Sequence, residues 1–431
     1  MNFKEFFDRY IRGWLPAEAK MQKHSPIKPI AAILFISISF SLIFILLSSF
    51  LLAAPSLEAI IEWDRTYQNE DSDEFGYSVI QTSDGGYAIA GDTRARSSDL
   101  NTDCYLIKTD DQGNMEWSQT YGGEFTDRAY SVVATSDGGF AIAGFTYSSG
   151  SGSPDYLLIK TDAYGNMEWN QTYGGTQWGI AYSLVVTSDG GYAIAGFTEF
   201  EEEGFTCWLV KTDAYGNMEW NQTYGEGLGG HLFLLTRTPE GGYALAATKY
   251  LEIDDRGGFW LVKTDTYGNI EWEQTYAIGI SEKIVSGMTM TSDGGFALSG
   301  IAHDGLLLKI DANGKLEWNQ TYSKGDGWEF ADWLVSTTDD GYILAGEMVH
   351  VGFDEGCLWL VKTDDLGKME WNQTYGELGG GWSRSMLRTS EGGYVITGFN
   401  QSFDESVGYF YSDLRLTKID CGTAQEVKSK D

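Results

Sequence analysis

A fourteen-residue phrase recurs along this chain and limits the folds that it can adopt. The copy from Lys160 to Tyr173 reads KTDAYGNMEWNQTY, and the phrase returns from Lys211 to Tyr224. Edited copies begin at Lys108, Lys263, Lys309 and Lys362. A second phrase, TSDGGYAIAG from Thr187 to Gly196, alternates with the first. Self-similarity at a nearly fixed period indicates a repeat architecture in which each unit packs on its neighbours.

Each repeat unit predicts four short strands. In the third unit the first strand is 181–187, and it ends at an Asp-Gly pair, which is a strong hairpin signal. The second strand is 192–197 and the third is 208–212. A turn follows in which Gly216 allows a positive φ, and the fourth strand is 218–224.

The number of units predicts the architecture. Seven tryptophans spaced by 46 to 54 residues mark the register: Trp63, Trp117, Trp169, Trp220, Trp272, Trp318 and Trp371. Four strands per unit of this length are typical of a β-propeller blade. The chain enters with a lone fourth strand, Ile60 to Tyr67, and its last unit stops after a third strand, 414–419. We therefore predict an all-β, seven-bladed β-propeller with four-stranded blades over residues 60–420, closed by the N-terminal strand.

Charge is distributed unevenly along the chain. The formal net charge is −33, but residues 1–29 hold six Lys/Arg against three Asp/Glu, so the remainder carries −36. A domain this acidic repels nucleic-acid phosphates and anionic lipids. We therefore predict no nucleic-acid partner.

The N-terminal region predicts membrane attachment. Residues 30–54 form a 25-residue run without a charge, long enough for a helix that crosses a bilayer. Lys20, Lys23 and Lys28 precede this run, so the positive-inside rule places the N-terminus in the cytoplasm and the propeller outside the cell. We predict a basic, amphipathic cytoplasmic segment over 1–29, a transmembrane signal anchor over 30–54 and a C-terminal tail over 421–431. A cleavable signal peptide, with small residues such as Ala53 and Ala54, is the alternative.

Within the repeated phrase, Asp162, Gly165 and Trp169 resemble the tryptophan-docking repeat of quinoprotein-type propellers, with one residue fewer between Asp and Gly. Residues 60–420 look like uncharacterised secreted or cell-surface propeller proteins of archaea and bacteria built on this repeat. The resemblance implies that each such Trp packs against the next blade. Quinoprotein dehydrogenases hold their cofactor with an adjacent cysteine pair and a calcium site. This sequence has no Cys-Cys dipeptide, so we predict no cofactor.

The four cysteines do not predict a disulfide framework. Cys104 and Cys207 occupy the same repeat position, Cys357 lies one residue earlier in its unit, and Cys421 follows the last unit. Equivalent positions on separate blades are too far apart to be bridged. We expect small apolar side chains that fill space.

Five Asn-x-Ser/Thr sequons are candidate glycosylation sites in an exported protein: Asn170, Asn221, Asn319, Asn372 and Asn400. The first four fall on predicted outer strands, and Asn400 follows the last predicted second strand. Duplication of Asn-Gln-Thr for strand geometry alone is the alternative explanation.

The connections from fourth to first strand and from second to third strand vary between units and emerge on one face, which is where function is usually placed. Histidines and exposed aromatic residues in these segments are the candidate binding residues: Trp178, His231, His303, Trp328, His350 and Trp382. Such aromatic residues beside carboxylates suit sugars or basic partners. They equally suit lids that seal the blade tops. No recognisable catalytic motif or metal-binding loop occurs, so we assign no catalytic residue and no metal ligand.

The sequence thus predicts a membrane-anchored, extracytoplasmic propeller that acts as a ligand-binding or scaffolding module at the cell surface. Its predicted partners are the membrane, through residues 30–54, and a surface glycan or a basic protein. Two alternatives remain open. One is a glycan-active hydrolase or lyase that uses carboxylates or histidines of the variable face. The other is a propeller that docks another exported protein during envelope assembly.

Overall fold

The computed structural model describes residues 59–69, 71–96, 101–149, 152–175, 177–200, 204–250, 257–277, 284–302, 304–323, 327–350, 356–375, 382–404 and 409–420. The chain divides into two units, Met1–Ser56 and Leu57–Asp431, and the described residues all belong to the second. The segments predicted over 1–29, 30–54 and 421–431 therefore lie outside the described residues. Within the described ranges, no helix is long and apolar enough to cross a membrane.

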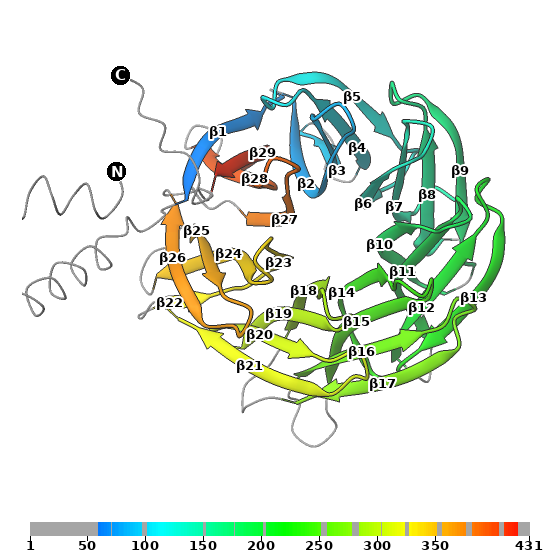
Figure 1. Ribbon diagram of the computed structural model, residues 1–431. Helices are drawn as coiled ribbons and strands as arrows, with labels where there is room; N and C mark the ends of the chain where they lie inside the picture. The colour runs from blue at the N-terminus through cyan, green and yellow to red at the C-terminus, as the bar shows by residue number, and fades with distance from the viewer. Residues whose placement is uncertain are drawn as a thin grey trace, which may run out of the picture. The chain divides into compact units, whose positions relative to one another are not determined.

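Seven antiparallel sheets form the blades around a central axis (Figure 1). Blade 1 contains β2 (Ser72–Gln81), β3 (Tyr87–Ala95), β4 (Thr102–Thr109) and β5 (Met115–Tyr121). Blade 2 contains β6 (Asp127–Ala134), β7 (Phe140–Thr146), β8 (Asp155–Thr161) and β9 (Met167–Tyr173). Blade 3 contains β10 (Gly179–Val186), β11 (Tyr192–Phe200), β12 (Gly204–Thr212) and β13 (Met218–Tyr224). Blade 4 contains β14 (Leu228–Arg237), β15 (Tyr243–Tyr250), β16 (Gly257–Thr264) and β17 (Ile270–Tyr276).

Blade 5 contains β18 (Ile284–Met290), β19 (Phe296–Ala302), β20 (Asp304–Ile310) and β21 (Leu316–Tyr322). In blade 6 the first strand is split into β22 (Gly327–Glu329) and β23 (Trp333–Ser336), which both pair with β24 (Tyr342–His350); β25 (Gly356–Thr363) and β26 (Met369–Tyr375) follow. Blade 7 contains β27 (Trp382–Arg388), β28 (Tyr394–Asp404), β29 (Tyr409–Asp420) and, as its outer strand, β1 (Ile60–Tyr67). The predicted all-β, seven-bladed propeller with four-stranded blades is confirmed.

The strand boundaries differ from the prediction mainly on the variable side of the blades. In blade 3, β11 continues to Phe200 and β12 begins at Gly204, so this hairpin is longer than predicted. In blade 7, pairing of β28 with β29 continues as far as Asp404 and Tyr409. Asn400 therefore lies within the last second strand, and its expected position after that strand was wrong. The strands are longer than predicted because backbone pairing between the second and third strands continues into segments whose side chains vary between repeats.

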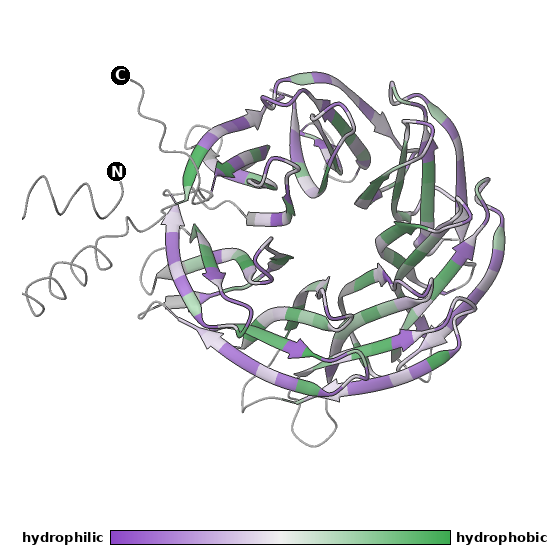
Figure 2. Cartoon of the chain, in the orientation of Figure 1, coloured by the Kyte–Doolittle hydropathy of each residue, from purple (hydrophilic) through white to green (hydrophobic). Residues whose placement is uncertain are grey.

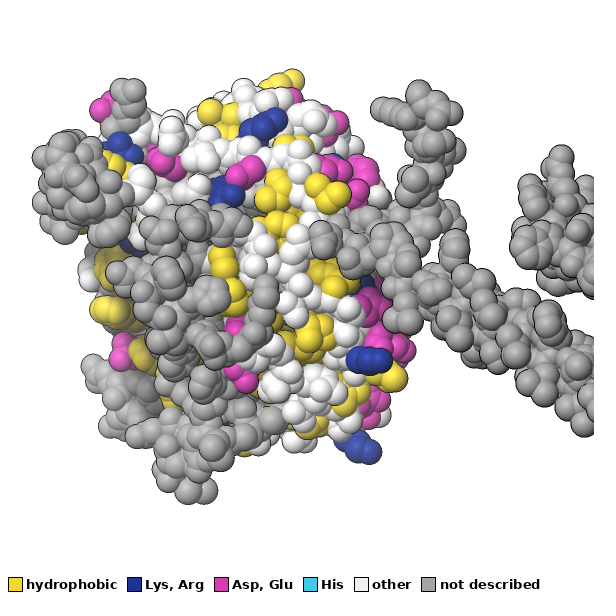
Figure 3. All heavy atoms as spheres, turned by 90° about the vertical axis from the view of Figure 1, so that its left-hand side faces the viewer, with side chains coloured by type: hydrophobic (Ala, Val, Ile, Leu, Met, Phe, Trp, Pro, Cys, Tyr) yellow, Lys and Arg dark blue, Asp and Glu magenta, His cyan; other side chains and the backbone are white. Residues whose placement is uncertain are grey.

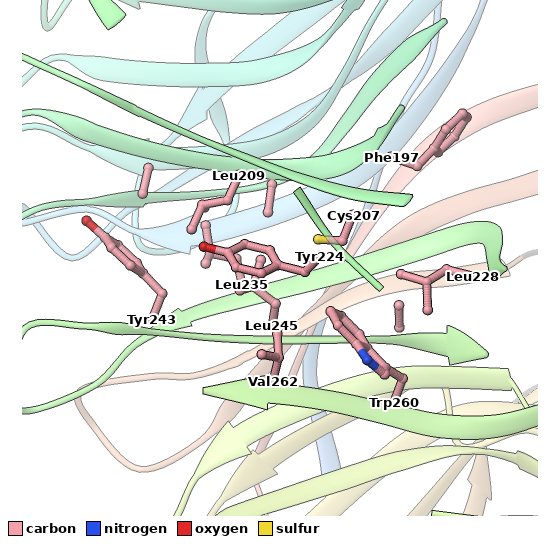
Figure 4. Packing of buried hydrophobic residues seen from close by; sticks show 13 residues of the cluster. Phe197, Cys207, Leu209, Tyr224, Leu228, Leu235, Tyr243, Leu245, Trp260 and Val262 are labelled. Atoms are coloured by element: carbon pink, nitrogen blue, oxygen red, sulfur yellow. The ribbon is translucent and has the colours of Figure 1, made fainter. Parts of the chain in front are cut away.

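Buried residues form seven clusters, and each cluster joins two neighbouring blades. Figure 4 shows the cluster between blades 3 and 4, where Cys207 and Leu209 meet Leu245 and Trp260. Another cluster joins Trp63 of β1 and Leu416 of β29 to strands of blade 1. Inner strands carry more apolar residues than the outer strands (Figure 2). Cys104 and Cys207 are buried and unpaired, as predicted for space-filling side chains.

The tryptophan of the outer strand packs on a glycine in the next blade in blades 1 to 5 and in blade 7. Gly165 has φ +77, and a Cβ at this position would approach within 2.6 Å of the Trp117 ring. The same ring meets Phe140 edge-on at 5.9 Å between centroids, and the Tyr121 hydroxyl donates a 2.6 Å hydrogen bond to the Gly165 carbonyl. The predicted structural role of this glycine and tryptophan is confirmed.

In blades 1 to 6 a lysine clamp ties the turn after the first strand to the outer strand. In blade 2 the buried Lys160 ammonium contacts Asp137 and Glu168, each at 2.8 Å, and donates to the Thr161 carbonyl at 2.8 Å. Burial alone would raise the pKa of Asp137, but hydrogen bonds from Lys160 and Thr135 hold that pKa at about 2. Lys108, Lys211, Lys309 and Lys362 make equivalent pairs. The Asp of the repeated Asp-Gly turn thus has a structural role.

Blades 7 and 1 also make side-chain contacts with each other. Strand β1 pairs with β29 from Ile60↔Asp420 to Tyr67↔Leu414. Arg96 of blade 1 contacts Asp73 at 3.2 Å, and its guanidinium lies 4.1 Å from the ring centroid of Tyr411 in blade 7. The Ser385 hydroxyl of blade 7 accepts a 3.3 Å hydrogen bond from the Val79 amide of blade 1.

Two glycine substitutions separate the docking contact from backbone strain. Gly165 and Gly138 both have positive φ, but a Cβ at Gly138 would meet nothing within 4 Å. We expect Gly138→Ala to cost about 1–2 kcal/mol from its left-handed backbone alone. Gly165→Ala should cost roughly 1–3 kcal/mol more, because its methyl group displaces Trp117. Urea unfolding of both variants measures the difference, and equal losses would contradict the docking role.

Candidate functional site: the axial cluster

The residues singled out from the sequence do not gather in loops. His231 lies in β14, Trp328 in β22, His350 at the end of β24 and Trp382 at the start of β27. Gly327 pairs with His350 and Trp328 with Val349, so the backbones of Trp328 and His350 are neighbours in blade 6. Trp178 precedes β10 and is 47% exposed. His303 lies outside the described residues. The strands therefore extend into segments that the sequence indicated as loops.

The sequon asparagines are strand residues. Asn170, Asn221 and Asn319 are exposed on outer strands, whereas Asn372 and Asn400 are half-buried. The side-chain oxygen Oδ1 of Asn400 accepts a 3.2 Å hydrogen bond from Arg415. Glycosylation at these positions stays a prediction. Acidic and basic side chains both lie at the surface of the side shown in Figure 3, with apolar side chains between them.

A different set of variable residues lies on the innermost strands, which surround the axis in Figure 1. The position ten residues before the start of the second strand differs sharply among blades 1 to 7: Tyr77, Tyr130, Tyr182, Phe233, Ser286, Asp332 and Arg384. In blades 1, 2, 3, 5 and 7 the strand pairing skips this residue at a β-bulge. A bulge re-aims a side chain and commonly lies beside a functional site.

A second variable position lies on the neighbouring strand. The residue that follows the small residue Gly or Ala in each second strand is, from blade 1 to blade 7, Asp92, Phe145, Phe197, Thr248, Ile301, Glu347 and Phe399. Blades 6 and 1 therefore contribute carboxyl groups on either side of blade 7, which contributes Arg384. We call Tyr77, Asp92, Arg128, Tyr130, Tyr182, Asp332, Glu347 and Arg384 the axial cluster.

One side of the axial cluster is aromatic. The rings of Tyr77 and Tyr130 lie 5.2 Å apart between centroids, and those of Tyr130 and Tyr182 lie 5.0 Å apart. The rings of Phe145 and Phe197 adjoin Tyr130 and Tyr182 at 6.0 and 6.1 Å. All three tyrosines are half-buried, so each keeps some solvent-accessible surface. A continuous aromatic surface thus spans the inner strands of blades 1 to 3.

The other side of the cluster is charged. Arg128 contacts the Asp92 carboxylate at 3.3 Å, and Asp92 is only 1% exposed. The Tyr77 hydroxyl interacts with the same carboxylate and lowers the pKa of Asp92. The Arg384 guanidinium lies 5.8 Å from the centroid of the Phe399 ring. Its charge lowers the pKa values of Asp92, Asp332 and Glu347, so it interacts with carboxyl groups of both neighbouring blades.

Burial dominates the titration of these carboxyl groups. It raises the pKa of Asp332 to about 7, against the opposing effect of Arg384. Burial, with the nearby Asp332 charge, raises the pKa of Glu347 to about 7. The pKa of Asp92 is raised to about 6 by burial, although Arg128 and Tyr77 lower it. Raised carboxyl pKa values that arise from burial and specific neighbours concentrate at functional sites.

Several buried polar atoms of this region lack a hydrogen bond within the described residues. They include Oδ1 of Asp92, Oε2 of Glu347, Nε of Arg128 and, in blade 5, Oγ of Ser299. An unsatisfied buried polar group costs about 1–3 kcal/mol, so a cluster of them is not explained by stability. The repeated turns, in contrast, satisfy their carboxylates; Asp162, for example, accepts hydrogen bonds from Tyr164 and Asn166.

Sequence reasoning missed the axial cluster, although a signal was present. The first three repeats match one another closely and place Tyr77, Tyr130 and Tyr182 at one position. The same position of the repeat holds Asp332 and Arg384 in blades 6 and 7. A change of chemistry inside a repeated strand is a stronger signal than variation in a loop. Only the connections between strands were considered as places for a binding site.

A second acidic region lies at the constant turns of blades 5 and 6. A cavity of about 600 Å³ there is lined by Asp293, Glu317, Asp340 and Asp365 together with Lys309. Asp340 has φ 60 where six other blades have glycine. Lys309 already pairs with Asp293 and Glu317, at 2.7 and 2.9 Å, so the lysine clamp explains most of this charge. Among the described residues, no group of three or more His, Cys, Asp or Glu is arranged to hold a metal ion.

Comparisons with known proteins agree on the fold alone. No family model matches the sequence, and a search of curated proteins finds no relative. Among solved structures, puromycin hydrolase matches with a TM-score of 0.50 and 12% identity over 80% of this chain and 54% of that chain. The chain therefore spans about half the length of that protein.

Two further solved structures match less well. BBS1N, solved in complex with ARL6DN, has a TM-score of 0.48 and 8% identity over 86% of this chain and 99% of that chain. A protein of unknown function from Bacteroides caccae has a TM-score of 0.40 and 13% identity over 63% of this chain and 90% of that chain. The chain is a seven-bladed β-propeller with four-stranded blades, a fold consistent with a binding or scaffolding module.

The carboxyl groups of the cluster predict how stability depends on pH. Their unfolded pKa values are near 4, and the folded values of Asp332 and Glu347 are raised to about 7. Between these values the folded protein binds more protons than the unfolded chain, so stability falls as pH rises from about 4 to 7. We expect a higher melting temperature at pH 5 than at pH 8.

Asp332→Asn removes one of these groups and should reduce the difference between pH 5 and pH 8. Each pKa unit corresponds to about 1.4 kcal/mol, and partial solvent access lowers the share that is realised, so we expect on the order of 1–2 kcal/mol. Asp111→Asn removes a carboxylate from an exposed turn and is the control. Thermal unfolding from pH 4.5 to 8.5 measures the effect, and parallel profiles for wild type and Asp332→Asn would contradict it.

Proposed function

We propose that the protein is a membrane-anchored, extracytoplasmic propeller that binds a ligand of the cell surface at its axial cluster. The observation that carries this proposal is the change of chemistry at one inner-strand position, from tyrosine in blades 1 to 3 to Asp332 and Arg384 in blades 6 and 7. The docking glycines, tryptophans and lysine clamps keep the same chemistry in most blades. Departure from the repeat at the axis therefore reflects a requirement other than folding.

The proposed location follows from the sequence. The uncharged run 30–54 behind Lys20, Lys23 and Lys28 is the proposed anchor, with the propeller outside and the sequons available for glycosylation. The Trp-on-Gly contact between blades supports membership of the tryptophan-docking, quinoprotein-type group of bacterial or archaeal surface propellers. A surface glycan is the favoured partner, and a basic protein is the alternative.

An enzyme acting on surface glycans is the second candidate. Asp332 and Glu347 interact electrostatically, and both have pKa values near neutrality. Two carboxyl groups of this kind are suited to general acid and base catalysis of glycoside cleavage. The inner strands, and not the variable loops, would then supply the catalytic groups.

We also propose that β1 closes the ring. Ala59 occupies the position held by a turn glycine in other blades, and its carbonyl accepts a 2.7 Å hydrogen bond from Tyr375 of blade 6. On its other side, Tyr67 of β1 donates a 2.8 Å hydrogen bond to the Gly113 carbonyl of blade 1. The outer strand of blade 7 therefore makes the same two contacts as any other outer strand.

Removal of residues 60–67 tests closure. We expect a loss of more than about 5 kcal/mol in unfolding free energy, because the deletion removes the buried Trp63 and Tyr67 and exposes the β29 edge. A chain that lacks residues 421–431 is the control. Cooperative melting of the 60–67 deletion at the wild-type temperature would refute closure by β1.

Intact cells that display the full chain with a C-terminal tag test location and binding together. We expect the tag to be accessible to antibody from outside, and the cells to retain labelled envelope polysaccharide without cleaving it. Cells that express a chain without residues 2–54 are the control. A tag that is reached only after permeabilisation contradicts the location, and failure to retain any envelope material contradicts the binding role. Cleavage that is lost in Glu347→Gln would establish the enzyme instead.

A further inference from the structure

We propose that the axial cluster binds an uncharged saccharide, whose ring stacks on Tyr130 and Tyr182 while its hydroxyl groups meet the charged side of the cluster. The inference rests on the proposed binding function and names the ligand class and the residues of its site. The two halves of the cluster match the two faces of a sugar. A pyranose ring presents apolar C–H groups on one face and hydroxyl groups around its edge.

The aromatic half supplies the stacking surface. Tyr77, Tyr130 and Tyr182 follow one another across three blades at centroid distances of 5.2 and 5.0 Å. Their interplanar angles, 64° and 33°, place successive rings at an incline, so the surface is curved and not flat. Tyrosine rings offer a large contact area at a low entropic cost, and their hydroxyl groups add hydrogen-bonding capacity at the edge.

The charged half supplies hydrogen-bond donors and acceptors that the protein leaves partly unused. Oδ1 of Asp92 and Oε2 of Glu347 accept no hydrogen bond within the described residues, although both residues are more than nine-tenths buried. Nε of Arg128 lies 3.3 Å from the other carboxylate oxygen of Asp92 but makes no hydrogen bond within the described residues. Hydroxyl groups donate and accept at once, so a sugar edge can engage carboxyl and guanidinium groups together.

The mixture of charges argues against an ionic ligand. Arg128 and Arg384 repel a cation, and their charge is already balanced by Asp92, Asp332 and Glu347. An anion meets those three carboxyl groups and a domain that carries a formal charge of −36 after residue 29. A neutral, polyhydroxylated ligand avoids both penalties and uses every group of the cluster.

Direct binding to the purified full chain tests this inference. The chain is held in lipid nanodiscs, because glycoside detergents would compete for the site. The probes are two matched pairs and a mixture: maltotriose against trigalacturonate, chitotriose against its deacetylated cationic form, and the neutral fraction of envelope polysaccharide. Calorimetry should detect binding of at least one neutral probe, and the charged member of its pair should bind at least tenfold more weakly.

Three tyrosine variants locate the site. Tyr130→Ala should weaken binding of the neutral probe by roughly tenfold or more, because the stacking surface is lost. Tyr130→Phe keeps the ring and should stay within about threefold of wild type. Tyr164→Ala removes a tyrosine that is 74% exposed on a turn of the same blade, and it should leave binding unchanged. Tyr182→Ala repeats the test should Tyr130→Ala fail to fold, as judged by its melting curve.

Each contrary result has a distinct meaning. Preference for the cationic or the anionic probes overturns the ligand class. Neutral binding that survives both Tyr130→Ala and Tyr182→Ala overturns the site. Absence of binding by every neutral probe overturns the inference as a whole. If displaying cells still retain envelope material in that case, the proposed binding function stands without this site, and if they retain none, both fail.

Discussion

The contact of an outer-strand tryptophan with a glycine of the next blade is the interaction on which the structure depends. A blade alone cannot bury both faces of its sheet, so its stability comes from its neighbours. At Gly165 the positive φ and the missing side chain together let the Trp117 ring lie against the turn, while Tyr121 fixes the distance through its hydroxyl group. The repeated phrase encodes both halves of this contact. The tryptophan of each copy packs against the following blade, and its glycine receives the tryptophan of the preceding blade.

A scaffold fixed at its outer rim leaves the inner strands free to differ. Packing between blades is carried by the Trp-on-Gly contact and by alanine or leucine side chains at the interfaces, while the lysine clamps tie strands within a blade. The bulged inner position contributes little to those contacts, so tyrosine, serine, aspartate and arginine are all tolerated there. The chemistry that varies between blades is thereby brought to one place, although the residues concerned lie more than 300 positions apart, from Tyr77 to Arg384.

The outer part of the fold was predictable from the sequence because repetition reveals register. The fourth strands, Ile60–Tyr67 and Met218–Tyr224, were predicted with their observed bounds, since the tryptophan register marks both and an Asp-x-x-Gly turn precedes the second. The inner strands were harder to delimit, because β14 and β28 run on into variable segments that read as loops. The axial cluster was missed for a related reason. Its members become neighbours only when the blades are arranged around the central axis. The spacing of these residues along the chain does not indicate that they are close.

The interface between blades 7 and 1 contains several charged side chains. The chain passes directly from β1, the outer strand of blade 7, to β2 of blade 1, whereas β1 joins the rest of blade 7 only through its pairing with β29. Asp73, at 1% side-chain exposure, contacts both Arg94 and Arg96, while Arg96 also approaches Asp413 of blade 7 at 3.8 Å. Burial raises the pKa of the neighbouring Glu74 to about 7, although Ser72 donates a hydrogen bond to it. Buried ion pairs add little net stability, but their directional contacts favour one arrangement over others. Because no turn connects β1 to β29, contacts of this kind help to hold blade 7 in one position against blade 1, where hydrophobic contacts alone would tolerate sliding.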